Sequence, residues 1–92
     1  MESPVRVYVT AYCPYCVQAK RFLDRMQVAY DTIDVSGDAD KRIWLAQTTG
    51  MRTVPQIFVG EVSVGGFTDM MERHEKGEFL PLLDAHGVTY SA

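Results

Sequence analysis

The chain has two cysteines, Cys13 and Cys16, and only Pro14 and Tyr15 lie between them. A thiolate attacks a disulfide sulfur through a mixed disulfide, so two thiols at this spacing can carry out thiol–disulfide exchange. A purely structural disulfide explains the pair poorly, because the stabilisation that a disulfide gives grows with the loop it closes, and this loop is very short. The pair therefore serves either thiol–disulfide exchange or metal binding.

The elements around the pair indicate which cysteine attacks. Apolar residues alternate over 5–9, which is typical of a strand, and a helical pattern begins at Pro14, a residue that suits the first helical position. Cys13 then stands just before the helix, where free backbone N–H groups and the helix dipole favour the thiolate and lower the pKa of Cys13. Cys16 lies inside the first turn and is more buried. We therefore expect Cys13 to be the nucleophile and Cys16 the resolving cysteine, closing a redox-active disulfide.

The remaining pattern completes one small domain over residues 1–92. It predicts further strands at 30–35, 56–59 and 62–64, a second helix that runs to Thr49 and stops at Gly50, a third helix with Thr68 as its N-cap, and a short last helix that ends at Gly87. The order is β-α-β-α-β-β-α-α. A strand, a helix and a strand within some thirty residues favour a parallel βαβ unit.

Composition excludes several functional classes. The chain is 47% apolar and 23% charged, which is enough for one compact core. No apolar run approaches the ~20 residues that cross a bilayer, and residues 1–4 lack the features of a signal peptide, so we expect a cytoplasmic protein without a membrane partner. A net charge of −3 without a basic run argues against nucleic-acid binding.

A metal site is a weaker explanation of the cysteine pair. His74 and His86 are twelve residues apart, whereas a zinc finger has His-x₃₋₅-His, so no zinc is expected. An iron–sulfur cluster held between two subunits remains open as an alternative.

The chain resembles the glutaredoxins over roughly residues 5–83. Three motifs carry the resemblance, in the family's order and at fitting spacings: Cys-Pro-Tyr-Cys at 13–16, Thr-Val-Pro at 53–55 before a strand, and Gly-Gly-x-x-Asp at 65–69. The resemblance implies an α/β, thioredoxin-like fold, in which a four-stranded mixed sheet is flanked by helices.

The resemblance also implies a function. Glutaredoxins are glutathione-dependent enzymes that reduce protein disulfides and protein–glutathione mixed disulfides, so glutathione is the expected co-substrate, and disulfide-containing or glutathionylated proteins are the expected partners of a monomer. Two alternatives remain. One is a glutaredoxin-like electron donor to ribonucleotide reductase that thioredoxin reductase reduces, although such proteins lack the Gly-Gly-x-x-Asp turn. The other is an iron–sulfur carrier that uses Cys13 of two subunits and bound glutathione.

Glutathione contacts carry over from the family onto matching positions. Tyr15 would flank the sulfur, while Thr53 and Val54 would hold the backbone of the glutathione cysteine, with Val54–Pro55 as a cis bond. Close backbone approach at the glycine pair and the start of the third helix suit the γ-glutamyl end. The residues assigned there are Gly66, Phe67, Thr68 and Asp69. Arg42 and Arg52 match positions near the glycine carboxylate.

Two positions depart from the family pattern. Many members have a lysine three residues before the first cysteine, where this chain has Thr10, and many have a cysteine where it has Phe67. A lysine would help to fix both the thiolate and a glutathione carboxylate. Without it, we expect the pKa of Cys13 toward the upper part of the range of about 3.5–7.5 that is found for activated thiols of this kind.

Overall fold

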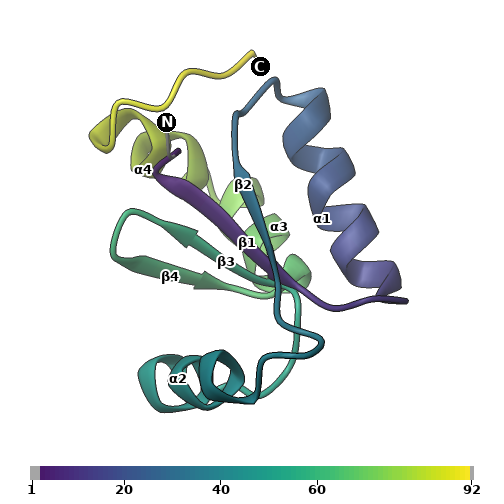
Figure 1. Cartoon of the computed structure of the whole chain (residues 1–92). Coiled ribbons are helices and arrows are strands. Elements are labelled where there is room, and N and C mark those ends of the chain that lie inside the picture. The colour runs from purple at the N-terminus through teal and green to yellow at the C-terminus, as the bar shows by residue number, and fades with distance from the viewer. Residues whose placement is uncertain (1–2, 92) are drawn as a thin grey trace.

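The computed structural model describes residues 3–91, and its elements follow the predicted order (Figure 1). The strands are β1 (Val5–Val9), β2 (Asp31–Asp34), β3 (Gln56–Val59) and β4 (Val62–Gly65), and the helices are α1 (Pro14–Arg25), α2 (Ala39–Thr49), α3 (Phe67–Glu75) and α4 (Phe79–Ala85). Met1 and Glu2, which belong to the segment where we expect no export signal, lie outside the described residues. No helix in the described part is long and apolar enough to span a membrane.

The four strands form one mixed sheet in the order β2-β1-β3-β4. β1 pairs in parallel with β2, as the βαβ prediction requires, and antiparallel with β3, which in turn pairs antiparallel with β4. Val7 stands opposite Thr32 on one side and Ile57 on the other. This is the thioredoxin-like fold that the sequence motifs implied.

Helices cover both faces of the sheet. α1, α3 and α4 pack on one face, and α2 lies apart from them on the other (Figure 1). Alternate residues of β1 face the two layers: Val7 packs toward α1 and α3, and Tyr8 packs with Leu45 of α2. Because both faces are covered, nearly all of β1 is buried.

α2 is attached to the sheet mainly through a small aromatic cluster. Leu45 is its buried residue, while Trp44 stays partly exposed and stacks on Phe58 of β3 with 6.1 Å between ring centroids. Gly50 ends the helix at a φ of 76°, as predicted, because glycine adopts the left-handed conformation without steric cost. The chain then enters the loop 51–55, which leads back to the cysteines.

Candidate functional site

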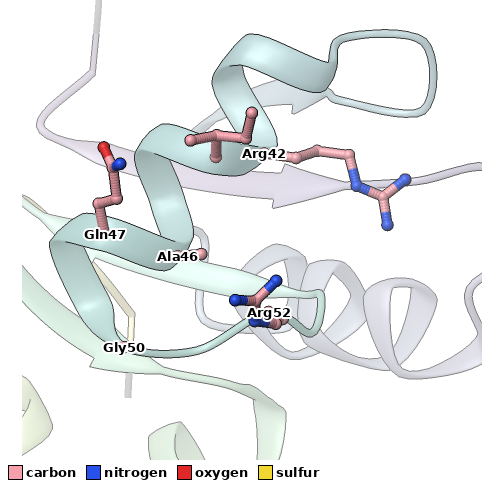
Figure 2. Close-up of a pocket in the computed structure, with 6 residues that line it drawn as sticks. Arg42, Ala46, Gln47, Gly50 and Arg52 are labelled. Carbon is pink, nitrogen blue, oxygen red and sulfur yellow. The ribbon is translucent and has the colours of Figure 1, made fainter.

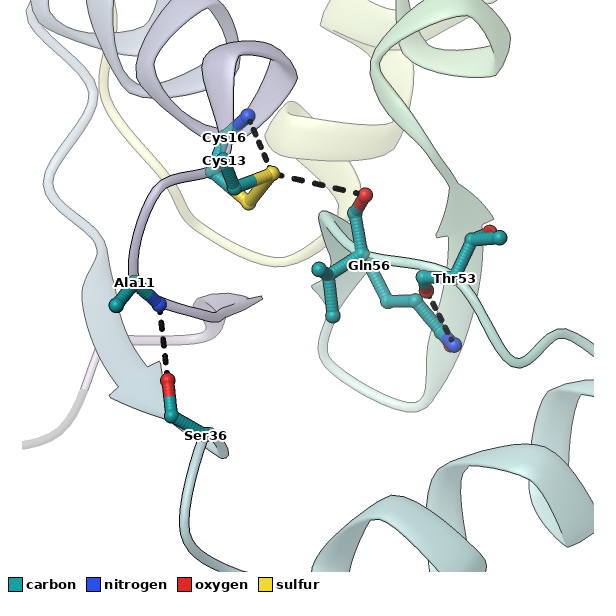
Figure 3. Close-up of a disulfide and its surroundings, with 7 residues drawn as sticks. Ala11, Cys13, Cys16, Ser36, Thr53 and Gln56 are labelled. Carbon is teal, nitrogen blue, oxygen red and sulfur yellow. Dashed lines mark hydrogen bonds between the residues drawn. A yellow bond between two sulfur atoms is a disulfide. The ribbon is translucent and has the colours of Figure 1, made fainter.

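The cysteine pair sits at the start of α1, as the sequence predicted. Cys13 is the N-cap of the helix, Pro14 is its first residue, and the N–H of Cys16 donates to the sulfur of Cys13 at 3.2 Å (Figure 3). The two cysteines form a disulfide with 5.2 Å between their Cα atoms. Cys16 is only 2% exposed, whereas Cys13 is half-buried. Cys13 is therefore the sulfur that a second molecule can reach.

The turn that leads into Cys13 is tied to the other side of the βαβ unit. The backbone N–H of Ala11 donates to the hydroxyl oxygen of Ser36 at 2.8 Å (Figure 3). Hydrogen bonds from the hydroxyl and the backbone N–H of Ser36 hold the pKa of Asp34 below its usual value. This series of hydrogen bonds, Asp34–Ser36–Ala11, fixes the position of the turn and therefore the position of Cys13.

A cleft of about 320 Å³ lies beside the disulfide and brings together eight of the ten predicted glutathione-binding residues. These are Tyr15, Thr53, Val54, Pro55, Gly66, Phe67, Thr68 and Asp69. The carbonyl oxygen of Val54 lies 3.7 Å from the sulfur of Cys13, so the cleft begins at the reactive atom. Val54–Pro55 is a cis peptide bond, as the family resemblance implied. Met51, which no sequence motif indicated, also lines the cleft.

The far wall of the cleft is the N-terminus of α3, which begins two residues earlier than predicted. Gly66 is the N-cap, not Thr68, because the carboxylate of Asp69 accepts the backbone N–H of Gly66 at 2.9 Å and closes the first turn there. The N–H groups of Phe67 and Thr68 belong to that first turn and have no intrahelical partner. They are therefore available to an anionic group in the cleft.

Gly65 is required by this cap. Its φ is +100°, and a Cβ atom there would come within 2.9 Å of the Cγ of Asp69. A side chain at this position would displace the carboxylate that holds α3 in place.

The two arginines lie outside the cleft. Arg42 of α2 and Arg52 of the following loop line a neighbouring hollow of about 520 Å³, together with Ala46 and Gln47 (Figure 2). Within residues 3–91 the one salt bridge joins Lys41 to a neighbouring aspartate, so both guanidinium groups are free to bind an anion. The predicted glutathione-binding residues are thus divided between the cleft and this adjoining basic hollow.

Within residues 3–91, no three His, Cys, Asp or Glu side chains converge to hold a metal ion.

A buried amide, which no sequence motif indicated, holds the loop that carries the cleft residues. Gln56 is 1% exposed, and its Nε2 donates to the carbonyl oxygen of Met51 at 2.9 Å. The same nitrogen donates to the carbonyl oxygen of Thr53 at 3.0 Å (Figure 3). Its Oε1 lies 2.9 Å from the hydroxyl of Thr49, the last residue of α2. A polar residue in an otherwise apolar strand directly after Pro55 was the available signal, because a buried amide needs hydrogen-bond partners.

A Cys-x-x-Cys disulfide at the start of the first helix, on a mixed sheet of this topology, defines a redox protein of the thioredoxin-like fold. Comparison with known proteins narrows the class. The glutaredoxin family model matches residues 5–64. A glutaredoxin of Pseudomonas aeruginosa is 43% identical over 82 residues, which cover 89% of this chain and 98% of that protein.

Solved structures agree with this assignment. The buckwheat glutaredoxin–glutathione complex superposes with a TM-score of 0.86 at 35% identity, covering 94% of this chain and 81% of that one. Oxidised glutaredoxin 2 from Chlamydomonas reinhardtii gives 0.79 at 33% identity, covering 91% and 82%. The chain belongs to the glutaredoxin family, whose members are oxidoreductases.

Proposed function

We propose that this protein is a glutathione-dependent thiol–disulfide oxidoreductase that reduces protein–glutathione mixed disulfides and protein disulfides. The observation that carries the proposal is the cleft that begins at the sulfur of Cys13 and ends at the free N–H groups of α3. Glutathione has an extended backbone between two carboxylates, and the cleft offers a backbone edge and an anion site to match. That the related buckwheat protein was solved as a glutathione complex supports the same ligand.

In the proposed assignment each end of glutathione has its own contacts. Val54 lies outside the β3 ladder, so its N–H and C=O can pair with the backbone of the glutathione cysteine, which amounts to a one-residue strand addition. The γ-glutamyl carboxylate would accept hydrogen bonds from the N–H groups of Phe67 and Thr68. Arg42 and Arg52 would attract the glycine carboxylate from the adjoining hollow.

The proposed reaction with a glutathionylated protein needs one cysteine. The Cys13 thiolate attacks the glutathione sulfur, a new S–S bond forms between them, and the protein's sulfur leaves as a thiolate that takes a proton from water. A second glutathione thiolate then attacks the glutathione sulfur bound to Cys13. Oxidised glutathione leaves, and the Cys13 thiolate is restored.

Reduction of a protein disulfide needs both cysteines. Cys13 attacks one sulfur of the substrate and forms a mixed disulfide, and Cys16 then attacks Cys13 and releases the substrate as a dithiol. The Cys13–Cys16 disulfide is the product of this step, and two glutathiones reduce it. We place this chemistry in the cytoplasm, where glutathione keeps thiols reduced, and in a monomer.

A pair of serine variants tests the proposal. Cys13→Ser should abolish all exchange, since the remaining thiol, Cys16, is only 2% exposed and a substrate disulfide cannot reach it. Cys16→Ser should retain activity on glutathionylated substrates and lose most reduction of protein disulfides. Equal loss of deglutathionylation in both variants would overturn the assignment of roles.

The choice of reductant separates the proposal from its alternatives. Glutathione with glutathione reductase should support turnover, and thioredoxin reductase should not. The opposite result would identify an electron donor of the thioredoxin-reductase type. A brown colour and visible absorption in anaerobically purified protein would identify an iron–sulfur carrier instead.

A further inference from the structure

Apolar side chains are exposed around the reactive sulfur to an extent that glutathione does not explain. Of the five large apolar side chains that residues 3–91 leave exposed, three lie within one short segment: Tyr12, Tyr15 and Val17. Tyr15 lines the cleft, whereas Tyr12 and Val17 do not. Tyr12 is completely exposed, and it directly precedes Cys13. Glutathione carries no large apolar side chain, so its binding in the cleft leaves the ring of Tyr12 uncovered.

The backbone of Tyr12 is also in an unfavourable conformation. Its φ is +57°, in the left-handed region that bulky residues rarely adopt and that glycine or asparagine adopts at lower cost. Gln27 has a similar φ, but it follows the end of α1, where its N–H bonds to the carbonyl of Asp24 in an ordinary helix termination. Tyr12 does not end a helix, so helix termination does not account for its left-handed φ.

The turn around Tyr12 is held firmly, so its conformation is not that of a loose loop. Its neighbour Ala11 is fixed by the hydroxyl of Ser36, and Cys13 caps α1 on the other side. A strained residue that persists next to a reactive group points to a function for its side chain. An exposed ring directly before Cys13 can contact a polypeptide whose disulfide Cys13 attacks.

We propose that Tyr12 is a docking residue for protein substrates, and that it binds an apolar side chain adjacent to the oxidised cysteine of the substrate polypeptide. Val17 lies one helical turn after Cys13 on the same face of α1 and extends this surface. The inference rests on the proposed function, because it names the class of protein substrate that the same sulfur receives. It predicts that small glutathione mixed disulfides do not use Tyr12, whereas polypeptide substrates do.

Steady-state kinetics of Tyr12→Asn and Tyr12→Phe test this role. Asparagine tolerates the left-handed conformation and removes the ring, whereas phenylalanine keeps the ring. Three substrates are compared: the mixed disulfide of glutathione with 2-mercaptoethanol, and two glutathionylated peptides whose cysteine is flanked by leucine and phenylalanine or by alanines.

We expect Tyr12→Asn to raise KM about 3- to 10-fold for the apolar-flanked peptide, with kcat and the other two substrates unchanged and the Tm equal or higher. Tyr12→Phe should match the wild type. Equal effects on all three substrates would mean that Tyr12 acts on the sulfur or the cleft and would overturn the proposal, as would no effect on any.

A second readout needs no glutathione, so it separates this inference from the proposed function. Both peptides are prepared as mixed disulfides with thionitrobenzoate and mixed with reduced Cys16→Ser protein. Cys13 attacks the peptide sulfur, the new S–S bond forms, and thionitrobenzoate leaves as a coloured thiolate. The apolar-flanked peptide should react several-fold faster, and Tyr12→Asn should abolish that preference. If the wild type fails with glutathione but keeps this preference, only the proposed function is wrong; if the preference is absent, the docking role is wrong.

Discussion

Replacing Gln56 with methionine should weaken both the fold and the proposed glutathione site. Methionine is unbranched and of similar size, so the change removes the amide without opening a large cavity. Three hydrogen bonds disappear: those to the carbonyls of Met51 and Thr53, and the one that joins the amide oxygen to Thr49. At a net value of about 0.5–1.5 kcal/mol each, their sum is roughly 1.5–4.5 kcal/mol.

The expected loss lies in the middle of that range. Thr53 is exposed and Met51 is half-buried, so water can replace part of what their carbonyls lose, whereas the side chain of Gln56 itself is only 1% exposed. We expect the free energy of unfolding to fall by about 2–3 kcal/mol, which corresponds to a Tm lower by roughly 10–20 °C in a domain of this size. Urea unfolding of the reduced protein measures it.

The functional effect is distinct from the loss of stability. Because Gln56 holds the loop that carries Thr53 and Val54, the KM for a glutathione mixed disulfide should rise several-fold. Leu83→Ala is the matched control, since Leu83 is fully buried in α4 away from the cleft and such a truncation costs about 2–5 kcal/mol. The control should lose stability at unchanged KM. An unchanged KM in Gln56→Met, or a stability loss below about 0.5 kcal/mol, would refute the positioning role.

Three further results are expected. In Cys16→Ser, thiolate absorbance should titrate with a pKa of Cys13 below the free value of ~8.5, and a midpoint at or above it would show that the helix terminus does not act on the sulfur. Asp69→Asn keeps the shape of the side chain but weakens its bond to the N–H of Gly66, so stability should fall by about 0.5–2 kcal/mol in urea unfolding. Burial, with a hydrogen bond to the carboxylate of Asp24 in α1, raises the pKa of Tyr30 from 10.0 to about 12. The stability that this bond contributes is complete below pH 10 and falls as the pH rises toward 12, so urea unfolding against pH should show an alkaline loss in the wild type that Tyr30→Phe lacks.

The parts of the fold that follow from local pattern could be predicted from the sequence. Alternating valines in β1, the proline that opens α1 and the glycine that ends α2 each have one dominant physical preference, and the structure confirms the elements they mark. The start of α3 was placed wrongly at Thr68. A threonine before an acidic residue is an ordinary N-cap signal, but the carboxylate of Asp69 reaches back to Gly66, and only the three-dimensional turn reveals that competition.

The site was predictable where neighbours in sequence are also neighbours in space. The segments 53–55 and 66–69 appear as compact motifs, and the structure brings them to one cleft beside Cys13. Arg42 and Arg52 were grouped by their type and family position, whereas their distance from the cleft depends on how α2 packs against the far face of the sheet. The buried amide of Gln56 joins residues of a helix, a loop and a strand, and no local pattern contains that network.

Charge at the reactive sulfur is managed by the backbone in this protein. Thr10 supplies no cation, the first turn of α1 contains no acidic residue, and the N–H of Cys16 points at the sulfur of Cys13 at 3.2 Å. Backbone donors do not titrate, so the nucleophile should keep its activation over a wide pH range above its own pKa. A ligand carboxylate in the cleft likewise meets backbone donors, the unpaired N–H groups at the start of α3. The guanidinium groups lie only in the adjoining hollow. Affinity for glutathione in this chain should therefore depend on how rigidly the loop 51–55 and the cap of α3 are held, which makes the packing around Gln56 part of the binding site.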